Sequence, residues 1–145
     1  MAKAINDFRM NIPSKSVNEG FLRAVVSAFS ALCDPTIEEI NDIKTAVSEA
    51  VTNAIVHGYK EKQGRIYIDA AILPDNILRI KIKDKGEGIE DVKKAMEPLF
   101  TTAGDDRSGL GFTVMESFCD KVRVKSVRGK GTVVTLTKKI TGKCE

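Results

Sequence analysis

Residues 36–58, TIEEINDIKTAVSEAVTNAIVHG, decide the fold, because they predict one long amphipathic helix that also carries polar side chains suited to chemistry. Its apolar residues recur at helical intervals at Ile37, Ile40, Ile43, Val47, Val51 and Ala54. Thr36 and Glu39 have the spacing of a capping box, and Gly58 predicts the helix end. Glu49 and Asn53 fall on one side of this helix, away from the apolar stripe and one turn apart, so one ligand can reach both.

The segments before this helix predict one strand and one further helix. Alternating Phe8, Met10 and Ile12 predict a short strand that ends at Pro13. Ser16 and Glu19 have the spacing of a second capping box. The helix that they begin should run to Cys33, with an apolar stripe at Phe21, Leu22, Val25, Phe29 and Leu32.

The segments after it predict two hairpins with helical and polar stretches between them. Residues 65–73 and 77–83 alternate around a short turn, and so do residues 121–127 and 132–138. A short helix is expected near 90–96, a polar loop over 98–108, and a helix from about 111 to 119. The order β-α-α-β-β-α-loop-α-β-β predicts an α/β fold of the α+β two-layer sandwich type, a mixed, mainly antiparallel sheet with helices on one face.

Length and composition limit the classes of protein to which the chain can belong. The 145 residues fit a single domain over 1–145, and a net charge of +3 is too small and evenly spread to suggest a nucleic-acid surface. Three cysteines without metal-ligand spacing suit a reducing compartment, and two of them, Cys33 and Cys119, should pack as small hydrophobes. No apolar run or signal-peptide core indicates export, so we expect a cytoplasmic protein whose tail lysines, Lys138 among them, are solvated.

Two glycine-containing motifs predict contacts to a nucleotide. Asp84 precedes Gly86 and Gly88 after an apolar strand, where backbone can approach a flat ligand and the carboxylate can accept a hydrogen bond from the exocyclic amine of adenine. A plain surface turn is the alternative. Gly109-Leu110-Gly111-Phe112 lies just before the predicted helix at 111–119, where free backbone N–H groups favour phosphate, unless the glycines form only a flexible linker.

Glu49 and Asn53 suit phosphoryl transfer if the same site holds that nucleotide. The amide oxygen of Asn53 can bind Mg²⁺, which prefers few protein ligands together with phosphate oxygens and water. The Glu49 carboxylate can accept the proton of an attacking hydroxyl. Taken alone, such a pair is best explained as two solvated polar residues, and only the other motifs in the sequence reverse that interpretation. The polar stretch before Gly109 has the composition of a lid, and its Arg107 either clamps the terminal phosphate or is solvated.

The ordered motifs Glu-x-x-x-Asn, Asp-x-Gly-x-Gly, Gly-Leu-Gly and Gly-x-Gly-Thr resemble the ATPase fold shared by gyrase-type topoisomerases, heat-shock chaperones, sensor histidine kinases and mismatch-repair proteins. Residues 48–58 and 98–116 narrow the resemblance to the anti-sigma F factors of spore-forming bacteria, the sporulation stage II protein AB family. This resemblance covers essentially the whole chain. It implies a Bergerat-type ATP-binding fold and a serine-protein kinase that uses ATP and Mg²⁺.

The resemblance also implies roles for individual residues. Glu49 would be the general base, Asn53 the Mg²⁺ ligand, Asp84 the adenine reader with Gly86 and Gly88, and Gly109, Leu110, Gly111 and Phe112 the phosphate loop. Thr132 would hold adenine through water, and Thr101 or Thr102 could reach the terminal phosphate. The implied partners are the sporulation sigma factor F, which the homodimer would hold inactive, and an anti-anti-sigma factor as the phosphorylated substrate, with no nucleic acid or membrane.

The histidine count separates kinase classes without the resemblance. The chain has a single histidine, His57, inside the first motif, so no second histidine on a separate dimerisation helix can accept phosphate. We expect His57 to pack or to cap the helix end. Two other interpretations stay open: a sibling protein acting on a different sigma factor, and a binding module that uses nucleotide only as a switch. Glu49 argues against the second, because a pure binder needs no base.

Overall fold

The computed structural model describes residues 3–59, 62–89 and 107–142. In this part of the chain, five strands form one sheet in the order β1-β2-β3-β5-β4, and all neighbouring strands are antiparallel. The strands are β1 (Asn6–Pro13), β2 (Arg65–Leu73), β3 (Ile77–Asp84), β4 (Lys121–Val127) and β5 (Gly131–Lys139). The predicted first strand and both predicted hairpins are therefore confirmed, with bounds that differ by one or two residues.

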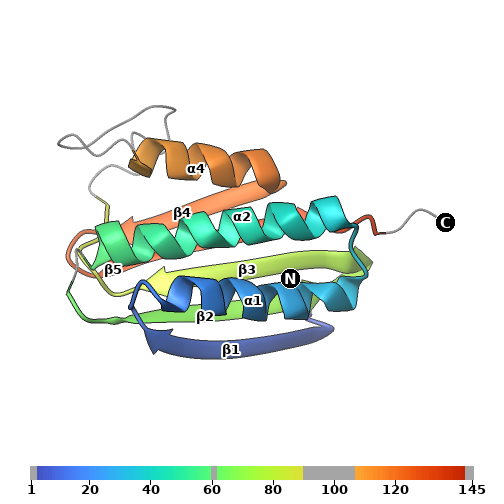
Figure 1. The fold of residues 1–145 in the computed structure, drawn as a ribbon, viewed down its shortest axis with the longest axis horizontal. Coiled ribbons are helices and arrows are strands. Elements are labelled where there is room, and N and C mark those ends of the chain that lie inside the picture. Colours follow the sequence, from blue (N-terminus) through green and yellow to red (C-terminus); the bar gives the residue numbers. More distant parts are fainter. Residues whose placement is uncertain (1–2, 60–61, 90–106, 143–145) are drawn as a thin grey trace.

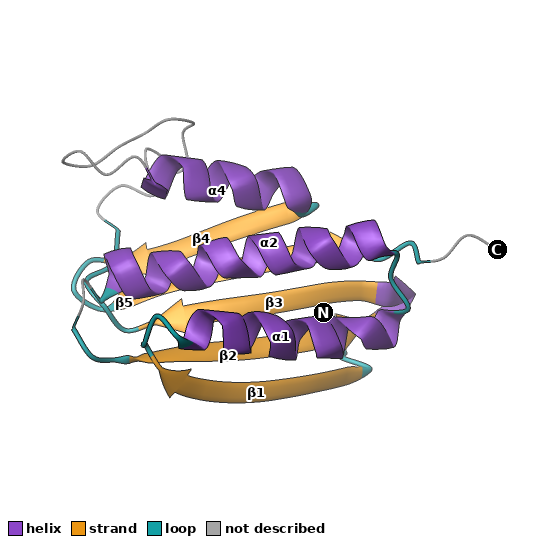
Figure 2. Cartoon of the chain, viewed as in Figure 1, coloured by secondary structure: helices purple, strands orange, loops and turns teal. Residues whose placement is uncertain are grey.

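The described helices lie on one face of this sheet, as the sequence predicts (Figure 1). They are α1 (Asn18–Ser30), α2 (Ile37–Asn53) and α4 (Arg107–Phe118), and short helical turns span Ala31–Cys33, Ala54–Gly58 and Pro74–Asn76. Helix α2 runs between α1 and α4 (Figure 2). The α/β two-layer fold class is thus confirmed. The helix expected near 90–96 lies outside the described residues.

Helix α2 begins with the predicted capping box. Glu39 N donates to Thr36 Oγ1 at 3.0 Å, and Thr36 N donates to Glu39 Oε1 at 2.9 Å. The same carboxylate accepts from the backbone of Thr141 and Gly142 near the far end of the chain. Burial by itself would raise the pKa of Glu39, but these hydrogen bonds lower it to about 2. One helix cap therefore also fastens the segment that follows β5.

The predicted capping box of α1 is wrong. The helix begins at Asn18 after Val17, without a side-chain cap, and Glu19 N donates to the backbone oxygen of Ser16 at 3.2 Å. Asn18 Nδ2 instead donates to Pro13 O at 2.8 Å, which ties the start of α1 to the end of β1. Ser16 lies one residue before the N-cap position. Its backbone oxygen accepts the hydrogen bond from Glu19 N, and its hydroxyl does not cap the helix.

The core lies between the helices and the sheet, and some predicted core positions lie outside it. Leu22, Val26, Ile43, Val47 and Val51 are fully or almost fully buried. In contrast, Phe21 is 51% exposed, Leu32 64% and Ile37 82%. The face of α1 that packs inward carries Leu22, Val26 and Ser30, so Phe21 and Leu32 lie outside this strip. Ile37 is the first residue of α2, and the fully buried stretch of that helix begins only at Ile43.

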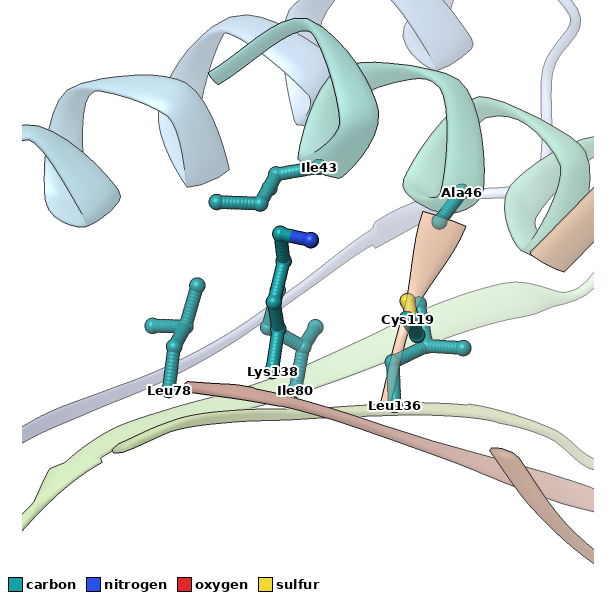
Figure 3. A pocket seen from close by; sticks show the side chains of 7 residues that line it. All are labelled: Ile43, Ala46, Leu78, Ile80, Cys119, Leu136 and Lys138. Carbon is teal, nitrogen blue, oxygen red and sulfur yellow. The ribbon is translucent and has the colours of Figure 1, made fainter. Parts of the chain in front are cut away.

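A small void between α2 and the sheet is lined in part by a lysine that the sequence did not place there (Figure 3). Lys138, predicted to be solvated, points into the core, where its Nζ donates to Phe118 O at 3.0 Å and lies 3.6 Å from Asp42 Oδ2. The inward position of residue 138 on β5 and the nearby carboxylate explain this correction. Beside it, burial raises the pKa of the Cys119 thiol to about 11, as expected for a cysteine that packs as a small hydrophobe.

Candidate functional site

Asp84 at the end of β3 is a buried carboxylate on the helix-covered face of the sheet. Its side chain is 5% exposed, and Oδ1 accepts a hydrogen bond from Gly86 N at 2.9 Å. Burial raises the pKa of Asp84 above its usual value, while the hydrogen bonds from the Gly86 and Thr132 backbones lower it in part. The alternative of a plain surface turn does not fit this burial, since the carboxylate lies inside the fold, although its hydrogen bond from Gly86 N is a local turn contact.

Gly58 lets the first motif reach this carboxylate. A methyl group added at Gly58 would lie 2.7 Å from Asp84 Cγ and Oδ1, too close for any side chain. The sequence predicts Gly58 as a helix stop, a position where glycine commonly has a positive φ, yet Gly58 is not among the residues with positive φ. Helix α2 instead passes into a π-helical turn over Ala54–Gly58. Gly58 is thus required for a close approach to Asp84, and not for the backbone conformation of a cap.

Gly86 joins the first two motifs backbone to backbone. A methyl group there would lie 1.9 Å from Gly58 O, the atom that accepts a hydrogen bond from Glu87 N at 2.8 Å. In the last motif, Gly131 has φ +128° and a methyl group on it would lie 2.1 Å from Asp84 O. Three motifs that are far apart in the sequence therefore meet around Asp84 with no space for side chains between them.

Thr132 and Ser126 form a polar pair beside Asp84. Thr132 pairs with Asp84 in the β3–β5 ladder and is 7% exposed. Its hydroxyl lies 2.9 Å from Ser126 Oγ, which accepts from Ile89 N at 2.6 Å and donates to Gly131 O at 3.1 Å. Asp84, Ser126, Gly131 and Thr132 line an open depression at this end of the sheet, together with Lys83, Lys125 and Val133 from the outward positions of the strands. Sequence reasoning missed Ser126, although a serine at an inward position that valine occupies elsewhere in the strand was an available signal.

Tyr59 is a second residue that the motifs did not reveal. Its hydroxyl accepts from Lys85 N at 2.8 Å and donates to Arg65 O at 2.6 Å. Lys85 directly follows Asp84, so the buried tyrosine fixes the end of β3 against the start of β2. Gly64 makes room for its ring, because a methyl group there would lie 2.3 Å from Tyr59 Cε1.

Glu49 and Asn53 lie one turn apart near the end of α2, and both are half-buried. The Asn53 Nδ2 atom is buried and has no hydrogen-bond partner in the described part of the chain. Such an orphaned amide is costly unless a ligand satisfies it. No group of three or more metal-binding side chains occurs among the described residues. Because Mg²⁺ at a nucleotide takes most of its ligands from phosphate and water, one asparagine oxygen fits that ion.

The glycine motif lies inside α4 and not before it, which corrects the predicted helix start. Helix α4 begins at Arg107, so residues 109–112 belong to its first two turns. The first four backbone N–H groups of a helix have no partner within it, so this end remains suited to an anion. Phe112 is 3% exposed and packs in the core. The side chains of residues 107–111, and Thr101 and Thr102 altogether, lie outside what the structure describes.

The motifs that meet around Asp84 lie within a stretch of sequence that matches known proteins. The histidine kinase-like ATPase domain family matches residues 13–138 of this chain. An anti-sigma F factor of Caldanaerobacter subterraneus subsp. tengcongensis is 58% identical over 136 residues, covering 93% of this chain and 94% of that protein. The chain belongs to the anti-sigma F factor family. A second anti-sigma F factor, from Clostridium acetobutylicum, is 52% identical over 135 residues and covers 92% of this chain and 94% of its own length.

Solved structures support the same fold for this anti-sigma F factor family member. A crystal structure of RsbU and RsbW domains from Mycobacterium tuberculosis superposes with a TM-score of 0.68 at 23% identity, covering 93% of this chain and 32% of that one. At this identity the likeness concerns the fold alone. In the described residues, no helix is long and apolar enough to cross a membrane.

Proposed function

We propose that this chain binds Mg-ATP where α2, the end of β3 and the β4–β5 hairpin meet, and that it transfers the terminal phosphoryl group to a protein serine. The observation that carries the proposal is the buried Asp84 carboxylate, closely surrounded by Gly58, Gly86 and Gly131. A buried carboxylate with a raised pKa is costly in the empty protein, and a hydrogen bond from the adenine amine would offset that cost. Thr132 would hold adenine through water.

The roles of the other site residues follow from their chemistry. Asn53 would hold Mg²⁺ through its amide oxygen, and the ion, when bound, neutralises charge on the phosphates. Glu49, one turn earlier on α2, would accept the proton of the attacking serine hydroxyl. The backbone N–H groups at the start of α4 would bind phosphate, with Arg107, Thr101 and Thr102 reaching the terminal phosphoryl group.

Serine is the proposed acceptor because the chain itself offers no separate histidine. The single histidine, His57, is in the π-helical turn next to Gly58. A histidine-kinase mechanism would need another histidine on a dimerisation element. The acceptor is therefore proposed to be a serine on a second protein, and the resemblance to the anti-sigma F factor family implies that this protein is the anti-anti-sigma factor.

Sigma factor F and a second copy of the chain are the further proposed partners. Exposed apolar residues in α1 and at its two ends support a protein contact there: Val17, just before the helix, is 78% exposed, Phe21 within it 51%, and Leu32, in the turn that follows, 64%. Exposed large apolar side chains that gather on one part of a surface mark interaction sites. We propose that the protein acts as a homodimer in the cytoplasm, that residues 1–145 are one kinase domain, and that it binds neither nucleic acid nor a membrane directly.

One experiment tests the phosphoryl transfer. The chain is incubated with γ-labelled ATP, Mg²⁺ and a purified anti-anti-sigma factor, and label on serine is measured by mass spectrometry. Serine phosphorylation that falls on the Glu49→Gln substitution would support the proposal. A protein that binds ATP but labels no substrate would favour the nucleotide-switch alternative, and sigma factor pull-downs in parallel would separate sigma F from a sibling factor.

A further inference from the structure

The face of the sheet opposite the helices carries a local concentration of positive charge, which the even spread of charges along the sequence did not reveal. The described helices all lie on the other face, and residues that pair across a ladder share a face (Figure 1). The outward positions of β3 and β4 carry six cations and no anion: Arg79, Lys81, Lys83, Lys121, Arg123 and Lys125. With a net charge of +3 for the whole chain, this surface is far more basic than the remainder.

These cations form two rows, and a strip of uncharged residues lies between them. Strand β5 lies between β3 and β4, and its outward residues opposite the rows are Val133, Thr135 and Thr137. Lys81 and Arg123 both pair with Thr135, on either side of it. Adjacent strands are about 4.8 Å apart, so the rows are about 10 Å apart, and successive cations in a row are about 7 Å apart.

These six cations form no ion pair among the described residues. The ion pairs found there are Arg9–Asp69, Arg23–Glu19 and Lys138–Asp42, and none involves the two rows. Asp69, on the same face, is held by Arg9 at 3.3 Å. Asp69 pairs with Lys81 in the β2–β3 ladder, so one carboxylate adjoins the rows, but no ion pair among the described residues joins a carboxylate to the six cations. We define the basic track as the six cations with Val133, Thr135 and Thr137.

We propose that the basic track is a docking surface for an acidic helical segment of a partner protein, on the opposite face of the sheet from the helices and bordering the depression beside Asp84 only at Lys83, Lys125 and Val133. An α-helix with side chains is about 10–12 Å wide, which matches the separation of the rows, and its residues at i and i+4 are about 6 Å apart. Glutamates along both flanks would meet the cations, while an apolar seam would lie over Val133 and the threonine methyl groups. Charge complementarity of this kind gives specificity and fast association.

Other occupants fit the surface less well. Single-stranded nucleic acid needs aromatic platforms for its bases, and the track has none. Tyr67, on neighbouring β2, has Lys85 Nζ over its ring at 4.8 Å. A second copy of this chain would bring like charges together. A membrane surface is disfavoured because the track lacks aromatic anchors.

The test uses a labelled helical peptide of about 20 residues with glutamates on both flanks of an apolar seam, and fluorescence anisotropy at low and moderate salt. We expect binding that weakens with salt and falls about tenfold or more in a Lys81→Glu, Arg123→Glu double variant. A matched control, Lys44→Glu with Lys62→Glu, makes the same charge change at exposed positions away from the track, and it should alter affinity less than about threefold.

Two further measurements keep the outcome decisive. The variant Arg79→Glu, Lys121→Glu, at track positions that do not line the depression beside Asp84, repeats the test if the first variant unfolds, and amide shifts of Val133 and Thr135 in NMR spectra should move on binding. Equal losses in the track and control variants would overturn the proposal. So would tighter binding of duplex DNA or of phosphatidylserine vesicles than of the peptide. ATP binding should be unchanged in the track variants, so this result is independent of the proposed kinase function.

Discussion

Replacing Gly58 by alanine is the sharpest probe of how the first motif meets Asp84. The added methyl group would lie 2.7 Å from Asp84 Cγ and Oδ1 and 2.8 Å from Oδ2. An ordinary van der Waals contact begins near 3.4 Å, so the carboxylate or the turn must shift by about 0.7 Å. Asp84 is 5% exposed and held by backbone donors, so it cannot move into solvent at no cost.

The expected magnitude follows from two opposing effects. Overpacking a tight site costs about 1–3 kcal/mol. Alanine also restricts the unfolded chain, which returns about 0.4–1 kcal/mol where the backbone is compatible. We therefore expect Gly58→Ala to lower the free energy of unfolding by about 0.5–2.5 kcal/mol. If the displaced carboxylate loses a charge-assisted hydrogen bond to adenine of about 1.5–3 kcal/mol, ATP affinity should fall by about 10- to 100-fold.

The assay pairs urea denaturation with calorimetric titration of Mg-ATP. Gly20→Ala is the matched control, because it makes the same chemical change within helix α1, where the nearest atom is Arg23 Nη2 at 3.7 Å. It should stabilise the protein by about 0.5–1 kcal/mol and leave ATP affinity unchanged. If Gly58→Ala were as stable as Gly20→Ala and bound ATP normally, the contact between Gly58 and Asp84 would not constrain the site, and the reasoning would be refuted.

Four further predictions concern catalysis, nucleotide choice, acid stability and control. Glu49→Gln should bind ATP normally yet slow phosphoryl transfer by about 10²-fold or more, and near-normal label transfer would remove Glu49 as the base. Asp84→Asn should weaken ATP binding in calorimetry, because an amide accepts the adenine hydrogen bond less well than a carboxylate. The pKa of Glu39 is lowered from 4.5 to about 2 in the fold, so its stabilisation is present above pH 4.5 and lost as pH falls toward 2; Glu39→Gln should flatten that part of the acid stability curve measured by circular dichroism. Sigma factor should bind more tightly with ATP than with ADP, and a Thr101→Ala, Thr102→Ala variant should reduce the difference in pull-downs; equal binding in the native protein would leave ATP only a phosphoryl donor.

Local sequence signals predicted the elements well where one short-range force dominates. Alternation placed both hairpins, because a half-buried strand must alternate apolar and polar residues. The Thr36–Glu39 capping box was confirmed at 2.9–3.0 Å, since its two partners are fixed by helix geometry alone. The same motif failed at Ser16, where a side-chain hydrogen bond from Asn18 to β1 sets the helix start. Tertiary contacts there outweigh a local preference.

The amino-acid sequence by itself predicted the motif residues that we propose for the site and the family that the chain resembles. It could do so because the motifs are local, and the spacing along a helix or strand decides which residues share a face. Only the tertiary structure decided how the motifs meet. Gly58 reads locally as a helix stop, yet its role depends on Asp84, 26 positions later. The roles of Tyr59 and of the buried Lys138 were likewise invisible to local patterns. Such contacts form only when segments that are far apart in the sequence pack against one another, so they depend on the fold of the whole chain.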